Sequence, residues 1–482
     1  MLFNSIDFAV FLPLTFGIYW FLTNKNLTLQ NVFILTASYV FYGWWDYRFL
    51  SLIIFSTITD FFVGKMLSKE ENRNRRKLLL WISISVNLGL LGFFKYYNFF
   101  LDNFIVAFSF FGKSISAQSL NIVLPVGISF YTFQTLSYTI DVYRRKMKPA
   151  TDFISFASFV SFFPQLVAGP IERAKNLLPQ FKRNRYFQYD QAIEGMRLIL
   201  WGFFKKTVIA DNSAEYVNLI FNNSEQLSGS TLLLGAVLFA FQIYGDFSGY
   251  SDIAIGTARL FGFRLMKNFA LPYFSRDIAE FWRRWHISLS GWFRDYLYIP
   301  LGGSRGSTAS KIRNTFIIFL VSGFWHGANW TFVAWGAINA FYFLPLLLGQ
   351  RNRNNLDIAA ADSVFPSLRE LLSIIGTFGL TVFAWIFFRA DHIGHAFSIV
   401  SEIFSVSLFS IPMYLKEIKM LLLILLIALL IIIEWAGRKE EYVLAVLDSY
   451  DSKILRWFVY YCLSMMTLLF SGTQQEFIYF QF

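Results

Sequence analysis

Apolar stretches long enough to cross a lipid bilayer recur along this chain from Phe8 to Phe470. A transmembrane helix needs about 20 mostly apolar residues, and inside a bilayer only helices and closed barrels satisfy their own backbone hydrogen bonds. Several stretches are short or broken, so we expect about 11 complete spans plus re-entrant and interfacial helices. The candidate spans are 7–22, 29–45, 49–67, 78–94, 98–112, 119–140, 152–168, 231–247, 312–325, 329–348, 371–389, 395–412, 417–436 and 454–471.

The composition supports an all-α polytopic membrane protein, with residues 1–482 forming a single integral-membrane domain. Hydrophobic residues make up 56% of the chain and charged residues 15%, whereas soluble domains carry about 25% charged residues. The aromatic residues lie within apolar runs, which favours helix packing and interfacial belts over stacking on nucleic acid. We therefore expect membrane lipids, and no nucleic acid, as partners. The single cysteine, Cys462, excludes an internal disulfide framework.

Two basic clusters indicate the topology. Residues 69–77 (KEENRNRRK) and 144–148 (RRKMK) are typical of cytoplasmic loops, which puts the N-terminus outside. Three candidate spans separate the clusters, an odd number, so we expect one segment, 98–112, not to cross. Residues 169–230 are more polar, and we expect surface helices there on the cytoplasmic side. The net charge of +11 fits this loop excess and can also help to hold anionic lipid headgroups.

The segment 275–300 (SRDIAEFWRRWHISLSGWFRDYLYIP) is not a span. Its spacing predicts a helix lying in the membrane interface, with an aromatic face opposite Arg283, Ser290 and Arg294. His286 lies on the flank between the two faces, so it is either a site residue or a surface-facing polar residue. The apolar face holds Phe281, Trp285, Leu289, Trp292 and Tyr296.

The apolar run 311–348 is too long for one span and too short for two. Its midpoint, SGFWHGANW, contains Gly323 and Gly327, which weaken a helix or let another backbone approach closely. A broken helix at membrane depth is tolerated where it lines protein or a wet cavity. We therefore predict that His326 lies at a helix break beside a cavity. An intramembrane ionisable residue is a functional candidate; the alternative is a neutral histidine bonded to a carbonyl inside the bundle.

Other polar residues leave alternatives open. Asp246 and Asp252 fall in a segment (YGDFSGYSD) that is expected to close the span 231–247, where each carboxylate costs about 2.5–3.5 kcal/mol at the bilayer centre. They either form a polar tunnel wall or pair with Arg259 or Arg264. Three residues near the end of another predicted span have metal-like spacing, but a loop should begin there, so we expect no metal site; they are Asp391, His392 and His395.

Long motifs then carry a resemblance. Six motifs together resemble the membrane-bound O-acyltransferase (MBOAT) family, in its bacterial branch of alginate and peptidoglycan O-acetyltransferases. They are FWRRWHISLSGWFRDYLYIPLGG, SGFWHGANWTFVAWG, PQLVAGPIERA, QIYGDFSGYSDIAIG, WIFFRAD and FIYFQF. The likeness covers nearly the whole chain. It implies a ring of tilted helices around a thin centre, with a funnel opening outward and a tunnel that admits a donor from the cytoplasm.

The resemblance also implies a function. His326 corresponds to the family's invariant histidine and His286 to its second polar position. The chain would move an acetyl group from cytoplasmic acetyl-CoA, with no bound cofactor, toward hydroxyls of an exported polysaccharide. A partner protein with an extracytoplasmic SGNH-type, hydrolase-like domain would often complete the transfer. The expected location is the bacterial cytoplasmic (inner) membrane.

The chemistry agrees with this reading. A neutral histidine can take the proton from an attacking hydroxyl, although a histidine-bound acyl intermediate is an alternative. Donors must also meet the developing oxyanion, and the candidates are Asn329, Trp325 and His286. One rival function keeps the fold and moves D-alanine onto teichoic acid; another is a transporter, although no internal repeat is visible. The expected substrate- or tunnel-lining residues are Asp246, Asp252, Trp325, Asn329, Arg283 and Arg284.

Overall fold

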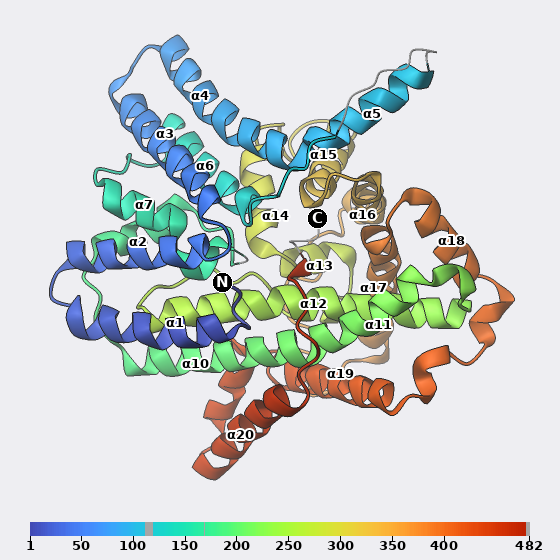
Figure 1. Cartoon of the computed structure of the whole chain (residues 1–482). Helices are drawn as coiled ribbons and strands as arrows, with labels where there is room; N and C mark the ends of the chain where they lie inside the picture. The colour runs from blue at the N-terminus through green and yellow to red at the C-terminus, as the bar shows by residue number, and fades with distance from the viewer. Residues whose placement is uncertain (111–118, 168, 479–482) are drawn as a thin grey trace. The chain divides into compact units, whose positions relative to one another are not determined.

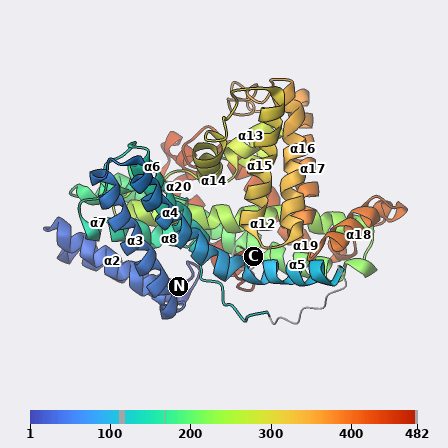
Figure 2. The same ribbon diagram turned by 90° about the horizontal axis from the view of Figure 1, so that it is seen from above.

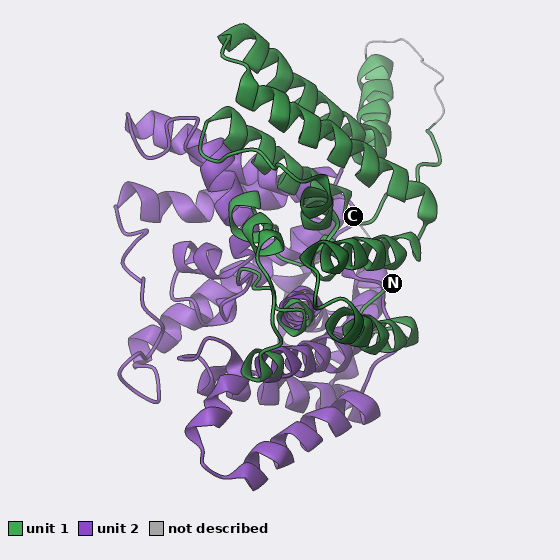
Figure 3. Ribbon diagram, turned by 90° about the vertical axis from the view of Figure 1, so that its left-hand side faces the viewer, with its two compact units in different colours: residues 1–192, 257–266 green, residues 193–256, 267–482 purple. Residues whose placement is uncertain are grey.

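A computed structural model describes residues 1–110, 119–167 and 169–478, and throughout these residues the regular secondary structure is helical (Figure 1). This confirms the predicted all-α class. The chain divides into two compact units (Figure 3): residues 1–192 with 257–266, and residues 193–256 with 267–482. That the whole chain acts as a single domain stays a prediction.

The helices of the first unit come mainly from residues 1–192 of the chain. They are α1 (Ile6–Gly17), α2 (Leu27–Gly43), α3 (Leu50–Lys69), α4 (Arg73–Leu91), α5 (Tyr97–Phe110), α6 (Ile128–Tyr143), α7 (Phe153–Ser161), α8 (Phe163–Leu166), α9 (Ala174–Leu177) and the start of α10 (Tyr189–Phe203). The helices of the second unit are α11 (Asp211–Asn222), most of α12 (Gly229–Leu260), α13 (Ile278–Arg284), α14 (Ile287–Phe293), α15 (Thr308–His326), α16 (Trp330–Leu348), α17 (Leu368–Arg389), α18 (Ile393–Ile403), α19 (Ile418–Ala436) and α20 (Lys453–Leu469).

Six helices in the described part of the chain are long and apolar enough to cross a membrane, or seven if the bent pair Ile393–Ile403 and Val406–Lys416 forms one span. The chain is therefore a multi-pass membrane protein, but the predicted count of about 11 spans is not confirmed. The run Arg73–Phe110 is a continuous helical stretch of 38 residues. The predicted segments 78–94 and 98–112 thus belong to one run as far as Phe110, and residues 111 and 112 lie outside the described residues.

In the first unit, a buried carboxylate ties three helices together. Asp60 on α3 is fully buried, and its carboxylate accepts hydrogen bonds from Asn87 Nδ2 on α4 at 2.8 Å and from Thr139 Oγ1 on α6 at 3.1 Å. Ser83 Oγ, also on α4, donates to the same carboxylate. Between transmembrane helices, where lipid competes with apolar contacts, such bonds supply specific attraction.

In the second unit, α15, α16 and α17 run side by side (Figure 2). Backbone-to-backbone contact joins α15 to α16: a Cβ atom at Gly323 would lie 2.2 Å from the carbonyl oxygen of Phe332, and one at Gly336 would lie 2.3 Å from that of Phe319. Only glycine fits these two positions. The α15 helix ends at His326 and α16 begins at Trp330, so the predicted helix break at His326 is confirmed.

Two sequence-based expectations about helix extent were wrong. The segment 275–300 is not one helix, because α13 ends at Arg284 and α14 starts at Ile287. The break occurs because residues 268–270 compete for its backbone: Ile287 N donates to Asn268 O, and Ala270 N donates to Arg284 O, each at 2.9 Å. The segment 244–252 does not close a span either, since α12 continues to Leu260 over 32 residues.

Candidate active site

His326 is enclosed by aromatic rings at the C-terminal end of α15. Its side chain is 3% exposed, and its ring centroid lies 5.0 Å from that of Trp325, 5.1 Å from that of Trp335 and 5.3 Å from that of Phe388. Gly327 follows in an extended conformation, and a Cβ atom there would lie 2.1 Å from the Phe332 ring. The chain thus turns out of the helix directly after the imidazole, which stays in a largely apolar cage.

His286 is buried at the break between α13 and α14, with 1% of its surface exposed. It adopts a left-handed backbone conformation, with φ of 43°, which is rare for a residue with a side chain. Such strain is most often kept at functional sites. Because the side chain is buried, the alternative of a surface-facing histidine is wrong.

The tautomer of His286 follows from its neighbours. Its Nδ1 lies 3.1 Å from Asn268 Oδ1, which also accepts from Ser288 Oγ at 2.8 Å, while Asn268 Nδ2 donates to Ser251 Oγ at 3.0 Å. Because an amide oxygen only accepts, Nδ1 carries the proton and Nε2 keeps the lone pair. Burial lowers the pKa of His286 to about 3, so the imidazole is neutral at physiological pH.

The Trp325 indole lies beside both histidines. Its ring centroid is 6.1 Å from that of His286 and 5.0 Å from that of His326. The structure therefore brings together three of the predicted site residues, from α15 and from the α13–α14 break, around one buried ring.

The other predicted site residues have structural partners. Asn329 caps α16 by accepting from Thr331 N at 3.0 Å, and its Nδ2 donates to Asp391 O at 2.8 Å. Arg283 donates to backbone carbonyl oxygens in the loop 352–355, and Arg284 donates to Glu280 and to Asp357 O. These arginines therefore hold the 350–357 loop against α13, and their predicted contact with a substrate stays a proposal.

Asp246 and Asp252 form ion pairs with two lysines of the π-helical turn Phe204–Ala210. Lys205 Nζ lies 2.7 Å from Asp252 Oδ2, and Lys206 Nζ lies 2.8 Å from both Asp246 Oδ1 and Asp211 Oδ1. The predicted pairing with Arg259 or Arg264 is therefore wrong. Burial opposes a charge on Lys206, but the two carboxylates raise its pKa overall.

The C-terminal segment is attached to this ion-pair cluster. Ile478 N donates to Asp246 Oδ2 at 2.7 Å, and Lys206 Nζ donates to Gln475 O at 3.2 Å. The fully buried Phe477 packs against Phe247, with ring centroids 5.9 Å apart, and Phe247 contacts the His286 ring at 4.6 Å. Asp246 thus anchors the tail beside the ring that supports His286.

A cavity of about 250 Å³ lies between α13, α14 and α15. Ser322, about one helical turn before His326, opens onto it together with Trp282 and Phe319, and Arg294 and Arg353 supply positive charge. Among the residues that the structure describes, no three His, Cys, Asp or Glu side chains are grouped to hold a metal ion. His392 instead caps α18, and His395 Nε2 lies 3.0 Å from Ser224 Oγ.

Comparison with known proteins identifies the family. The family model described as MBOAT, membrane-bound O-acyltransferase family, matches residues 143–355. A probable alginate O-acetylase of Azotobacter vinelandii is 40% identical over 84% of this chain and 78% of its own length. The chain belongs to the membrane-bound O-acyltransferase family.

Two other relatives of this O-acyltransferase differ in how much of the chain they match. A peptidoglycan O-acetyltransferase of Helicobacter pylori is 36% identical over 83% of the chain and 79% of its own length. A teichoic acid D-alanyltransferase of Streptococcus thermophilus is 32% identical over 44% of the chain and 54% of its own length. The family assignment makes the chain an enzyme, which removes the transporter as a rival reading.

Sequence reasoning missed three residues of the acyltransferase's candidate site. Lys205 and Lys206 lie in a stretch that was expected to be a surface helix, and Asn268 lies in an irregular segment. For the lysines a signal did exist, because two carboxylates inside an apolar stretch require cations elsewhere. For Asn268 there was none, since its role depends on a backbone pairing that only the fold reveals.

Proposed function

We propose that this acyltransferase moves an acetyl group from cytoplasmic acetyl-CoA toward hydroxyls of an exported polysaccharide, with His326 as the catalytic residue. The observation that carries the proposal is the pair of buried histidines, His326 and His286, which both lie beside the Trp325 ring. The names of the relatives support acetyl as the group and alginate or peptidoglycan as the class of acceptor. The D-alanyl rival rests on relatives that match less than half of the chain.

In the proposed reaction, neutral His326 takes the proton of the acceptor hydroxyl while the hydroxyl oxygen bonds to the carbonyl carbon of the acetyl thioester. The tetrahedral intermediate then collapses, the carbon–sulfur bond breaks, and the coenzyme A thiolate leaves and takes a proton from the imidazolium. His286 would accept a hydrogen bond at Nε2 and so orient the acceptor. The indole N–H of Trp325 is a candidate donor to the oxyanion.

The cavity beside Ser322 is the proposed entry for the donor. At about 250 Å³ it is below the roughly 300–1,000 Å³ of ordinary ligand pockets, which suits the narrow pantetheine arm better than a whole nucleotide. Arg294 and Arg353 line the same cavity, and their charges would attract the donor's phosphates.

A partner protein with an extracytoplasmic SGNH-type domain would complete the transfer to the glycan, and the proposed location is the bacterial cytoplasmic membrane. Both are part of the proposal: they are what the resemblance to the bacterial O-acetyltransferase branch of the family implies.

The test uses the purified full chain in proteoliposomes, with its extracytoplasmic partner and the polysaccharide on one side and a thioester donor on the other. Acetyl-CoA should release free thiol and place a labelled acetyl group on the far side, whereas a D-alanyl thioester should not react. Equal or faster reaction with the D-alanyl donor contradicts the acetyl assignment. Label that stays on the donor's side contradicts the proposed direction.

A further inference from the structure

A second cavity, in the first unit, lies far along the sequence from both histidines. It has a volume of about 660 Å³ and is formed where α1 leads into α2 and where the chain approaches α10. This volume falls within the roughly 300–1,000 Å³ of ligand pockets. Its lining residues are Phe16, Trp20, Phe21, Asn24, Lys25, Asn184, Arg185, Tyr186 and Phe187.

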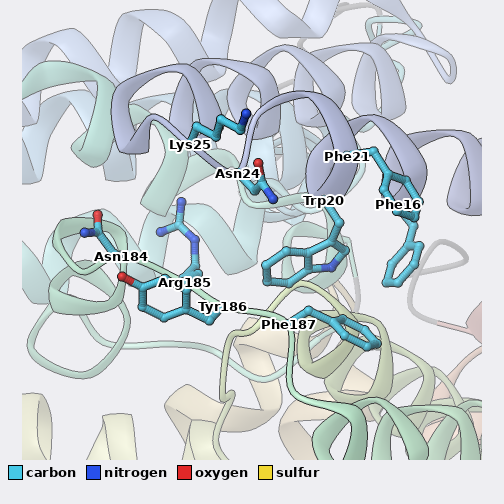
Figure 4. Close-up of a pocket in the computed structure, with 9 residues that line it drawn as sticks. All are labelled: Phe16, Trp20, Phe21, Asn24, Lys25, Asn184, Arg185, Tyr186 and Phe187. Atoms are coloured by element: carbon cyan, nitrogen blue, oxygen red, sulfur yellow. The ribbon is translucent and has the colours of Figure 1, made fainter.

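The lining is divided into a polar part and an aromatic part (Figure 4). Lys25 and Asn184 lie toward one end of the cavity, and the rings of Phe16 and Phe187 lie toward the other. The Phe187 ring packs edge-on against Trp20 and Phe16, with centroids 5.7 and 6.0 Å apart. The cavity therefore offers hydrogen-bond donors and an apolar wall to one amphipathic ligand.

The charge at this cavity is positive and not balanced by carboxylates. The Arg185 guanidinium, on a side chain that is 7% exposed, donates only to neutral acceptors, among them Tyr19 Oη and Asn31 Oδ1. Burial consequently lowers its pKa from the usual range. Among the residues that the structure describes, no Asp or Glu lines the cavity, so the positive charge of Arg185 faces it without a carboxylate in the lining.

Three further polar groups at the cavity are available to a ligand. Within the described residues, no hydrogen bond or ion pair engages the side chains of Asn24, Lys25 and Asn184. Exposed Lys182 and Arg183 lie immediately before Asn184 in the sequence. Basic pockets between membrane helices, with aromatic side chains at the interface, suit anionic lipid headgroups.

We propose that this cavity binds an anionic phospholipid, with its phosphate at Lys25, Asn24 and Asn184 and its glycerol backbone and upper acyl chains against Trp20 and Phe187. Arg185 does not touch the phosphate but supplies the fixed positive charge behind it. The site is separate from the proposed acetyl transfer, and its occupancy does not depend on that reaction.

Native mass spectrometry of the full chain, released from nanodiscs of phosphatidylcholine with or without phosphatidylglycerol, tests the proposal. The wild type should retain phosphatidylglycerol in preference to phosphatidylcholine. Lys25→Glu should weaken this retention by at least about fivefold, since each basic group near an anionic surface contributes on the order of a fivefold factor. Asn184→Asp, which places a carboxylate at the same end, should weaken it as well.

The matched control is Lys77→Glu, an equal charge reversal at an exposed position of α4, which should leave retention unchanged. Loss in Lys77→Glu equal to that in Lys25→Glu would show attraction by net charge alone and overturn the site. Equal retention of phosphatidylcholine and phosphatidylglycerol would overturn it too. Inorganic phosphate is the last arm: if it raises the thermal unfolding midpoint as much as the lipid does, the ligand is a soluble anion and not a lipid.

Discussion

The carboxylate of Asp246, midway along α12, accepts a 2.7 Å hydrogen bond from the backbone N–H of Ile478, more than two hundred residues later in the chain. Lys206 links the same two segments, because its Nζ forms an ion pair with Asp246 at 2.8 Å and donates a hydrogen bond to Gln475 O at 3.2 Å. An aspartate that was expected to line a tunnel thus holds the C-terminal segment in place. Through Phe477 and Phe247, that segment is packed toward His286.

Replacing Asp246 with alanine should detach the C-terminal segment. The change leaves Ile478 N without its acceptor and Lys206 with one carboxylate instead of two, and breaking a buried ion pair costs about 3–5 kcal/mol. We expect a lower free energy of unfolding in mixed micelles and faster digestion of the tail by carboxypeptidase. Glu70→Gln, which removes the half-buried partner 3.7 Å from the exposed Arg75, is the control and should cost about 0–1 kcal/mol. Equal digestion of wild type and Asp246→Ala would show that the anchor is unimportant.

Gly323→Ala should damage the α15–α16 packing that presents His326. The new methyl group would meet the carbonyl oxygen of Phe332 at 2.2 Å, and overpacking of this kind costs about 1–3 kcal/mol. Gly379→Ala on α17 is the control, because nothing lies within 4 Å of its Cβ position and alanine is the better helix former by about 1 kcal/mol. Thermal unfolding midpoints should fall for the first variant and hold or rise for the second. A reversed order would contradict the close helix contact.

Asn268→Ala tests whether Asn268 is a positioning residue for His286. Without its amide oxygen, Nδ1 of His286 loses the acceptor that fixes the tautomer, while the substrate-binding surfaces stay intact. We expect kcat to fall about tenfold, as for the loss of one buried hydrogen bond, with KM unchanged. Asn268→Asp retains an acceptor and should recover part of the rate. A change in KM alone would assign Asn268 to substrate binding instead.

The pH dependence of stability should contain a contribution from His286. Its folded pKa is about 3, whereas an unfolded histidine titrates near 6.5. Between these values the unfolded state binds a proton that the folded state does not. As the pH is lowered below about 6.5, the free energy of unfolding therefore decreases by about 1 kcal/mol per pH unit. His286→Asn should flatten the curve of unfolding midpoint against pH between 6.5 and 5. Parallel curves would mean that another group causes the slope.

The sequence was sufficient for features that depend on local composition. Long apolar runs predicted the helices, and the SGFWHGANW midpoint predicted the break at His326, because glycine spacing and an embedded histidine are visible without a fold. The motifs also predicted the family. The number of complete spans was not predictable in the same way, since an apolar run such as Arg73–Phe110 does not reveal whether it bends back or continues.

Features that depend on distant partners were out of reach. His286 interrupts a well-formed helical pattern because residues 268–270 pair with the backbone of Arg284 and Ile287. Nothing in the amphipathic spacing of 275–300 signals that competition. Asp246 and Asp252 were recognised as costly, but their cations come from Lys205 and Lys206, about 40 residues earlier. Charge balance predicts that partners exist, and only the packing of the helices determines which.

The central claim is that His326 performs the chemistry, and the initial rate of coenzyme A release from acetyl-CoA tests it most directly. The comparison uses wild type, His326→Gln and His392→Gln in the same proteoliposomes, with partner and polysaccharide present. His392 caps α18, so its variant is the control. We predict that His326→Gln loses about 10²–10⁴-fold in rate with an unchanged unfolding midpoint, while His392→Gln retains the wild-type rate. A His326→Gln enzyme that is as fast as wild type would contradict the account.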